Sequence, residues 1–172
     1  MPSTTRAPLA GPDAGPVAPF PLRLAGPVIK GFGRGSAELQ IPTANIPIAG
    51  LSVGGLTAVD SGVYFGFASL SSTRAVYPMV MSIGWNPFYK NTVRSVEVHI
   101  VHQFADDFYG DEMRLCVLGW IRPELDYVSK EALIEDIRTD IRVGLDSMDR
   151  AAYSSFQDDA YLMEFGKEEV EP

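Results

Sequence analysis

Segments with the composition of β-strands occupy most of the middle of the chain. They are rich in Val, Ile, Tyr, Phe and Trp, and Gly, Asn, Pro and Asp separate them. Strands at this spacing predict an all-β fold, either an antiparallel barrel or a sandwich. The segments are 27–30, 61–70, 75–85, 93–104 and 113–122.

One helix is expected after these strands. Ser129 is placed to cap the segment 130–145, in which apolar residues recur at helical spacing. We expect this apolar face to pack against the sheet. Its residues are Leu133, Ile134, Ile137, Ile141 and Leu145.

Length and composition fit one folded domain between two tails. The chain has 172 residues, of which 46% are hydrophobic, enough for a sizeable core. The first 27 residues hold seven of the 13 prolines, so we expect a disordered Pro/Ala-rich leader over residues 1–21. The domain is expected at 22–150, and an acidic C-terminal tail at 151–172.

Charge and cysteine content exclude several classes of protein. The net charge of −8 argues against a nucleic-acid or anionic-membrane surface. Cys116 is the only cysteine, which leaves no disulfide framework and favours a reducing, cytoplasmic location. No apolar run approaches the roughly 18 residues of a membrane span.

A glycine-rich stretch, GFGRGS at residues 31–36, is a candidate anion-binding loop. Its three glycines allow consecutive backbone N–H groups to approach a phosphate closely. The spacing matches neither the Walker A motif nor the dinucleotide fingerprint, and Pro42 and Pro47 follow too soon for an ordinary helix. A flexible turn between strands is the alternative.

The segment SVEVHIVHQ places a carboxylate and an imidazole on one side of a strand. Its alternation puts Glu97 and His99 on one face, and Val96, Val98 and His102 on the other. Glu97 is a candidate general base, and the alternative is a solvated strand face. The two histidines lie on opposite faces, which is a poor arrangement for a shared zinc ion.

The PTAN motif carries two hard, neutral oxygen ligands. Thr43 and Asn45 stand two residues apart, so in an extended segment both side chains lie on the same side. Magnesium is often completed by water and substrate phosphates, so two such ligands beside a phosphate loop suffice. An Asx- or ST-type turn is the alternative.

Four segments in this order resemble riboflavin kinases of the eukaryotic, single-domain type: GFGRGSAELQIPTANIP, SGVYFGFASL, MSIGWNPFYKNTVRSVEVHIVHQFADDFYGDEM and LGWIRPE. The resemblance spans about residues 27–144. It implies a small six-stranded antiparallel Greek-key barrel with a C-terminal helix. It also implies transfer of the γ-phosphoryl group of ATP to the terminal ribityl hydroxyl of riboflavin, giving FMN and ADP.

The resemblance also implies a role for individual residues. Glu97 stands at the catalytic base, and Thr43 and Asn45 stand at the metal ligands. The flavin-binding positions correspond to Arg122, Leu125 and Tyr127. The nucleotide-binding positions correspond to Gly31, Gly33, Arg34, Gly35, Ser36, Ala37, Thr43, Ile100, His102 and Tyr109. At Ala37 some relatives have a lysine, so one phosphate contact is left to the backbone.

These observations predict a monomeric, Mg²⁺-dependent riboflavin kinase, with Zn²⁺ or Mn²⁺ as alternative cations. Its expected partners are ATP, ADP, riboflavin and FMN. Neither a nucleic acid nor a membrane is expected to bind it. One alternative is a non-catalytic barrel that binds a nucleotide or a flavin, for which a yellow co-purifying ligand is a discriminating observation. Another is a flavin phosphatase, but beyond Glu97 the sequence offers no candidate to activate its water.

Overall fold

The six strands form one antiparallel sheet. The computed structural model describes residues 7–28, 43–47, 60–85, 94–102, 110–124 and 129–166. The sheet order is β1-β6-β3-β4-β5-β2, and all neighbours pair antiparallel. The strands are β1 (Leu22–Pro27), β2 (Thr43–Pro47), β3 (Gly62–Leu70), β4 (Val76–Trp85), β5 (Arg94–Ile100) and β6 (Glu112–Arg122).

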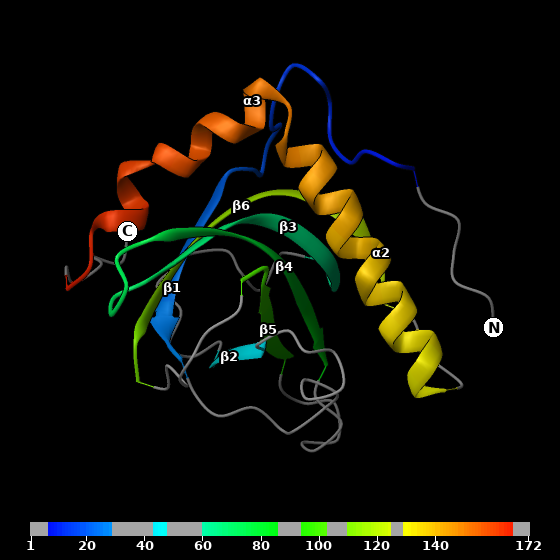
Figure 1. The fold of residues 1–172 in the computed structure, drawn as a ribbon, viewed down its shortest axis with the longest axis horizontal. Coiled ribbons are helices and arrows are strands. Elements are labelled where there is room, and N and C mark those ends of the chain that lie inside the picture. Colours follow the sequence, from blue (N-terminus) through cyan, green and yellow to red (C-terminus); the bar gives the residue numbers. More distant parts are fainter. Residues whose placement is uncertain are drawn as a thin grey trace.

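The connectivity confirms the predicted Greek key. Strands β3, β4 and β5 are consecutive neighbours, and β6 returns to lie beside β3. The sheet curls strongly (Figure 1), and its edge strands β1 and β2 contact each other. The prediction of a small six-stranded antiparallel barrel with a C-terminal helix is therefore confirmed.

Alternation along the strands separates an inner core from an outer face. In β4, Met79, Met81 and Ile83 point inward, while Val80 packs in a second cluster on the outside. Strands β3 and β6 contribute large apolar side chains to both clusters, because the C-terminal helices cover their outer face. The outer cluster contains Phe65, Phe67, Val80, Cys116, Leu118, Met148, Tyr153 and Leu162.

Helix α2 (Lys130–Met148) begins at the predicted cap. The Ser129 hydroxyl accepts a hydrogen bond from the Ala132 N–H at 3.2 Å, which satisfies a backbone donor of the first turn. The helix crosses the outer face of the sheet (Figure 1), where it contacts β3, β4 and β6. The predicted helix and its N-cap are confirmed.

The face of α2 that packs on the sheet agrees only in part with the predicted one. Leu145 is 37% exposed, and the other four predicted residues are only half-buried. Gly144 allows close approach, since a Cβ there would stand 3.0 Å from Val80 Cγ1. The buried residues of the helix are Asp136, Asp140, Val143, Gly144, Ser147 and Met148. Ile141 of the predicted face packs against the outer cluster, whereas Asp136 and Asp140 are buried on a face that the apolar pattern did not indicate.

The segment after α2 closes the outer cluster. Helix α3 (Ala151–Ser154) and the 3₁₀ helices η4 (Ser155–Asp158) and η5 (Ala160–Met163) follow one another across the top of the view in Figure 1. Tyr153 and Leu162 are fully buried in this cluster. The Ser69 hydroxyl donates a hydrogen bond to the Leu162 carbonyl at 2.5 Å, which ties η5 to β3.

The proline-rich leader packs on the end of α2. The Ala10 N–H donates to the Ser147 hydroxyl at 2.9 Å, and the Tyr153 hydroxyl donates to the Pro12 carbonyl at 2.7 Å. Arg150 donates to the Gly11 carbonyl at 2.9 Å and to the Asp13 carboxylate at 2.8 Å. The sequence predicted a disordered leader over 1–21. In the part of this leader that the structure describes, side-chain donors of the helical segment instead bind backbone carbonyls. The domain limits of 22 and 150 stay a prediction.

Candidate active site

Glu97 lies directly opposite an asparagine and a serine on the outer face of the sheet. Its register partners are Asn45 on β2 and Ser82 on β4. Residues directly opposite one another share a face, with Cβ atoms about 4.5–5.5 Å apart. Val96 and Val98 are fully buried in the inner core, while Glu97 is half-buried on the other face, as the alternation predicted.

A second register row lies beside the first. His99 on β5 is opposite Thr43 on β2 and Val80 on β4. His99 is 6% exposed, and burial lowers the pKa of its imidazole to about 4. His99 is therefore neutral near pH 7. Together with the Asn45–Glu97 pair, this row brings the predicted metal and base positions onto one patch of β2 and β5.

The row of Glu97 continues toward β6. Ser82 pairs with Val63 on β3, and Val63 pairs with Arg122 at the end of β6. The row thus runs across five strands, and Arg122 shares the outer face with Glu97. A β-bulge before Tyr64 sets this pairing. Because strands are about 4.8 Å apart, three strand steps separate Arg122 from Glu97 by roughly 14 Å along the sheet.

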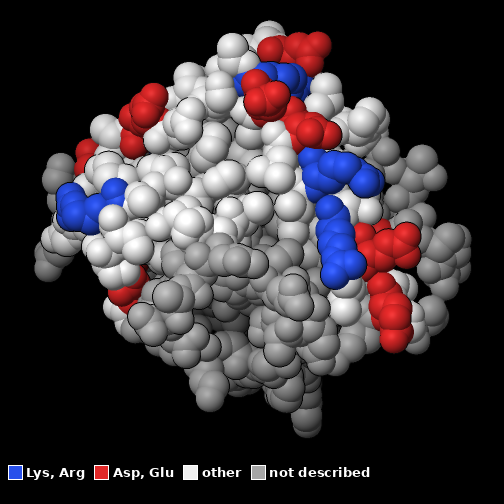
Figure 2. All heavy atoms as spheres, viewed as in Figure 1, with Lys and Arg blue, Asp and Glu red and all other residues white. Residues whose placement is uncertain are grey.

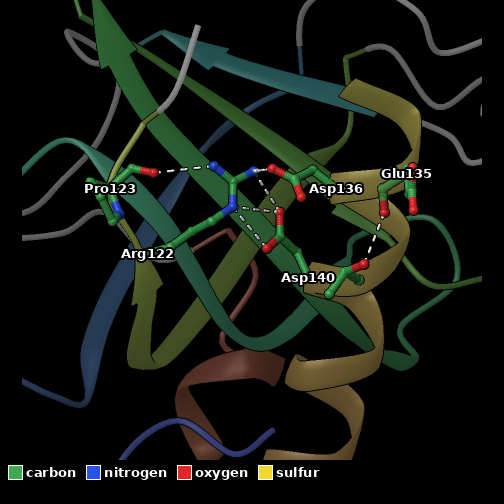
Figure 3. Close-up of polar contacts among 6 residues, drawn as sticks. Arg122, Pro123, Glu135, Asp136 and Asp140 are labelled. Carbon is green, nitrogen blue, oxygen red and sulfur yellow. Dashed lines mark hydrogen bonds and ion pairs between the residues drawn. The ribbon is translucent and has the colours of Figure 1, made fainter. Parts of the chain in front are cut away.

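Arg122 is buried under α2 and is held by carboxylates. Its Nε donates to both carboxylate oxygens of Asp140, at 2.9 and 3.1 Å, and its Nη2 donates to Asp140 at 2.8 Å. Asp136 stands 4.0 Å from Nη2, and Nη1 donates to the Pro123 carbonyl at 3.1 Å (Figure 3). Every guanidinium nitrogen therefore has a partner within the protein.

Two of the predicted nucleotide-binding residues lie at the end of β5. Ile100 is fully buried in the inner core and pairs with Met79, and its carbonyl accepts a hydrogen bond from the His102 N–H at 2.9 Å. His102 is exposed, and its ring centroid lies 4.6 Å from that of Tyr77, with the rings tilted by 41°. The two residues therefore offer different kinds of contact.

Several predicted site residues fall outside the described residues. These are the loop from Gly31 to Ala37, Tyr109, Leu125 and Tyr127. Thr43 and Asn45 are placed by the pairing of their strand with β5. Within the described parts of the chain, no three His, Cys, Asp or Glu residues gather into a metal site.

Sequence reasoning missed three polar residues of this region. Asp136 and Asp140 stand one helical turn apart, a spacing that places them on one face, and both are buried. Ser82 is the polar exception in the apolar run YPMVMSIGW. Both signals are present in the sequence, but neither predicts which residue lies nearby. The two carboxylates pair with Arg122, and Ser82 is the register partner of Glu97.

The surface charge over α2 is mixed. In the view of Figure 2, acidic and basic side chains lie close together along the side where α2 runs. None of the helices described above is both long and apolar enough to cross a membrane.

Comparison with known proteins identifies the family. The family model described as "Flavokinase: Riboflavin kinase" matches residues 18–148. Riboflavin kinase of Aspergillus terreus is 51% identical (88% of this chain, 86% of the relative), and that of Pyricularia oryzae is 50% identical (88% and 82%). The crystal structure of riboflavin kinase from Trypanosoma brucei superposes with a TM-score of 0.69 at 26% identity, covering 91% of this chain and 97% of that one. The chain therefore belongs to the riboflavin kinase family, whose members are ATP-dependent kinases.

Proposed function

We propose that this chain transfers the γ-phosphoryl group of ATP to the terminal ribityl hydroxyl of riboflavin, with Glu97 as the general base. The observation that carries the proposal is the register of β2 on β5. It pairs Asn45 with Glu97 and, one row away, Thr43 with His99. A base and two oxygen ligands on adjacent strands suit a reaction that depends on holding two substrates in line.

Glu97 is well placed to accept a proton. Val96 and Val98 anchor its strand in the inner core, while β2 and β4 flank it on both sides, so the carboxylate projects from a rigid support. The hydroxyl proton passes to Glu97 as the hydroxyl oxygen forms its bond to the γ-phosphorus. The bond between the γ-phosphorus and the bridging oxygen breaks, and ADP leaves.

Members of this family generally need a divalent metal, and the donor set here fits Mg²⁺. Thr43 and Asn45 supply hard, neutral oxygens, which Mg²⁺ accepts when water and substrate phosphates complete its coordination. On the neighbouring strand, Glu97 is the register partner of Asn45. When bound, the ion would offset the negative charge of the β- and γ-phosphates.

The other predicted site residues would bind either the nucleotide or the flavin. Backbone N–H groups of residues 31–37, with Arg34 and Ser36, would hold the nucleotide phosphates. The backbone at Ile100 and the side chains of His102 and Tyr109 would contact the rest of the nucleotide. Arg122, Leu125 and Tyr127 would border the flavin. Because Arg122 is engaged by Asp140, its contribution would be to shape that border.

The test is a comparison of two matched substitutions. The protein is incubated with ATP, Mg²⁺ and riboflavin, and FMN is separated by chromatography. Glu97→Gln keeps the side-chain shape and removes the base, so turnover should fall by about 10²–10⁴-fold while riboflavin still binds. Glu135→Gln makes the same change on the exposed side of α2 and should leave turnover unaltered. Near wild-type turnover of Glu97→Gln would overturn the assignment of the base.

A further inference from the structure

The corner where α2 meets α3 presents hydrogen-bonding groups that belong to the folded core. Ser147 and Tyr153 are both fully buried, and the Tyr153 ring centroid lies 5.8 Å from that of Phe65 on β3. The Arg150 guanidinium carbon stands 4.3 Å from the centre of the Tyr153 ring, and Arg150 Nε donates to the Ser147 carbonyl at 2.9 Å. The helical segment itself therefore holds these donors in place.

The leader lays its backbone over this corner, beside the end of α2 and α3 (Figure 1). The Ala10 N–H donates to the Ser147 hydroxyl at 2.9 Å, and the Ala10 carbonyl accepts a hydrogen bond from Arg150 Nη2. Arg150 Nη1 donates to the Gly11 carbonyl at 2.9 Å and to the Asp13 carboxylate at 2.8 Å. One guanidinium therefore binds two successive carbonyls and a carboxylate of the leader.

The shape of the corner selects a Gly-Pro turn. Gly11 has a φ of +80°, and a Cβ there would collide with the Tyr153 hydroxyl, so another residue would cost both backbone strain and space. The same hydroxyl donates to the Pro12 carbonyl at 2.7 Å, and that carbonyl also accepts the Gly15 N–H at 3.1 Å. Proline fits between these contacts because it has no N–H that would need a partner.

The leader is held mainly by polar contacts near the surface. Its larger apolar side chains stay in solvent, with Leu9 41% and Val17 56% exposed, and the small side chain of Ala10 packs on the outer cluster. A segment with few buried apolar contacts opens at a lower free energy than the whole fold. The leader can therefore leave the corner while the barrel stays folded.

We propose that Ser147, Arg150 and Tyr153 form a binding site for a short Gly-Pro peptide turn, and that the leader occupies this site as a releasable strap. When the strap is closed, it supplies acceptors for Arg150 and Tyr153 and holds α3 against β3. When it opens, both side chains lose these acceptors, and α3 becomes less protected. The inference is independent of the proposed function, since none of the three residues belongs to the candidate active site.

Hydrogen exchange of the full chain tests the strap. Gly11→Ala should release it, so the amides of α3, residues 151–154, should exchange about tenfold faster, because several hydrogen bonds are lost together. Val17→Ala, at an exposed position of the same leader, is the matched control and should exchange like wild type. Unchanged exchange of α3 in Gly11→Ala would overturn the strap.

A peptide added in trans tests the binding site. A synthetic peptide of residues 7–17, in large excess over the Gly11→Ala protein, should restore slow exchange over 151–154, because it presents the same turn. The peptide that itself carries Gly11→Ala should restore nothing. Adding Arg150→Lys to the protein should abolish the restoration, since lysine lacks the planar fork, whereas Arg138→Lys, at an exposed position of α2, should not. Failure of the wild-type peptide to restore protection would overturn the site.

Discussion

The guanidinium of Arg122 and the carboxylate of Asp140 are joined by three hydrogen bonds of 2.8–3.1 Å beneath helix α2. Arg122 ends β6 and Asp140 lies in the middle of α2, so the pair joins the sheet to the helix. Asp136 adds a second buried carboxylate 4.0 Å from the same guanidinium. Packing at this interface therefore depends on charge pairing as well as on apolar contact.

Asp140→Ala should strongly destabilise the fold. It leaves the buried Arg122 charge with a weaker partner, and breaking a buried pair in this way costs about 3–5 kcal/mol. The free energy of unfolding is measured in urea. Asp146→Ala, on the exposed side of the same helix, should cost less than about 0.5 kcal/mol. Equal effects of the two variants would contradict a stabilising role of the pair.

Asn45→Leu should weaken metal binding with little effect on stability. The substitution removes one neutral oxygen ligand without adding charge, so a higher Mg²⁺ concentration should be needed for half-maximal rate. A magnesium titration of FMN formation measures this. Unaltered titration and turnover would exclude Asn45 as a metal ligand and leave it as a residue of strand β2 alone.

His99 should make the fold less stable in mild acid. Its pKa is lowered to about 4 in the folded protein, whereas the unfolded chain protonates it near pH 6.5. Stability from this residue is therefore complete above about pH 6.5 and falls until about pH 4, by roughly 3 kcal/mol. The measurement is the difference in free energy of unfolding between wild type and His99→Gln across this range.

Leu162 should contribute more to the stability of the fold than Leu145. Leu145 was predicted to pack on the sheet but is 37% exposed, whereas Leu162, in the expected tail, is fully buried. Leu162→Ala should cost about 2–5 kcal/mol, and Leu145→Ala less than about 1 kcal/mol. Thermal unfolding of the two variants compares them directly. A larger effect of Leu145→Ala would contradict the contribution of Leu162 to the core.

The part of the candidate site that depends on the alternation of side chains along one strand was predicted from the sequence. The faces of Glu97, Val96 and Val98 follow from the two-residue period of an extended backbone, and the burial of both valines agrees. The positions of Thr43 and Asn45 relative to Glu97 do not follow from any local pattern. They depend on the pairing of β2 with β5, which β3 and β4 separate along the chain. The glycine-rich loop stays a prediction, because it lies outside the described residues.

The sequence by itself determined where β3, β4, β5 and β6 form, where Ser129 begins the helix and which face of its strand Glu97 occupies, because these are properties of neighbouring residues. Only the tertiary structure decided which face of α2 is buried and which strands carry the site together. Asp140 is buried because Arg122, on another element, compensates its charge. Such compensation depends on the spatial arrangement of distant segments, which the hydrophobic pattern of one helix does not contain.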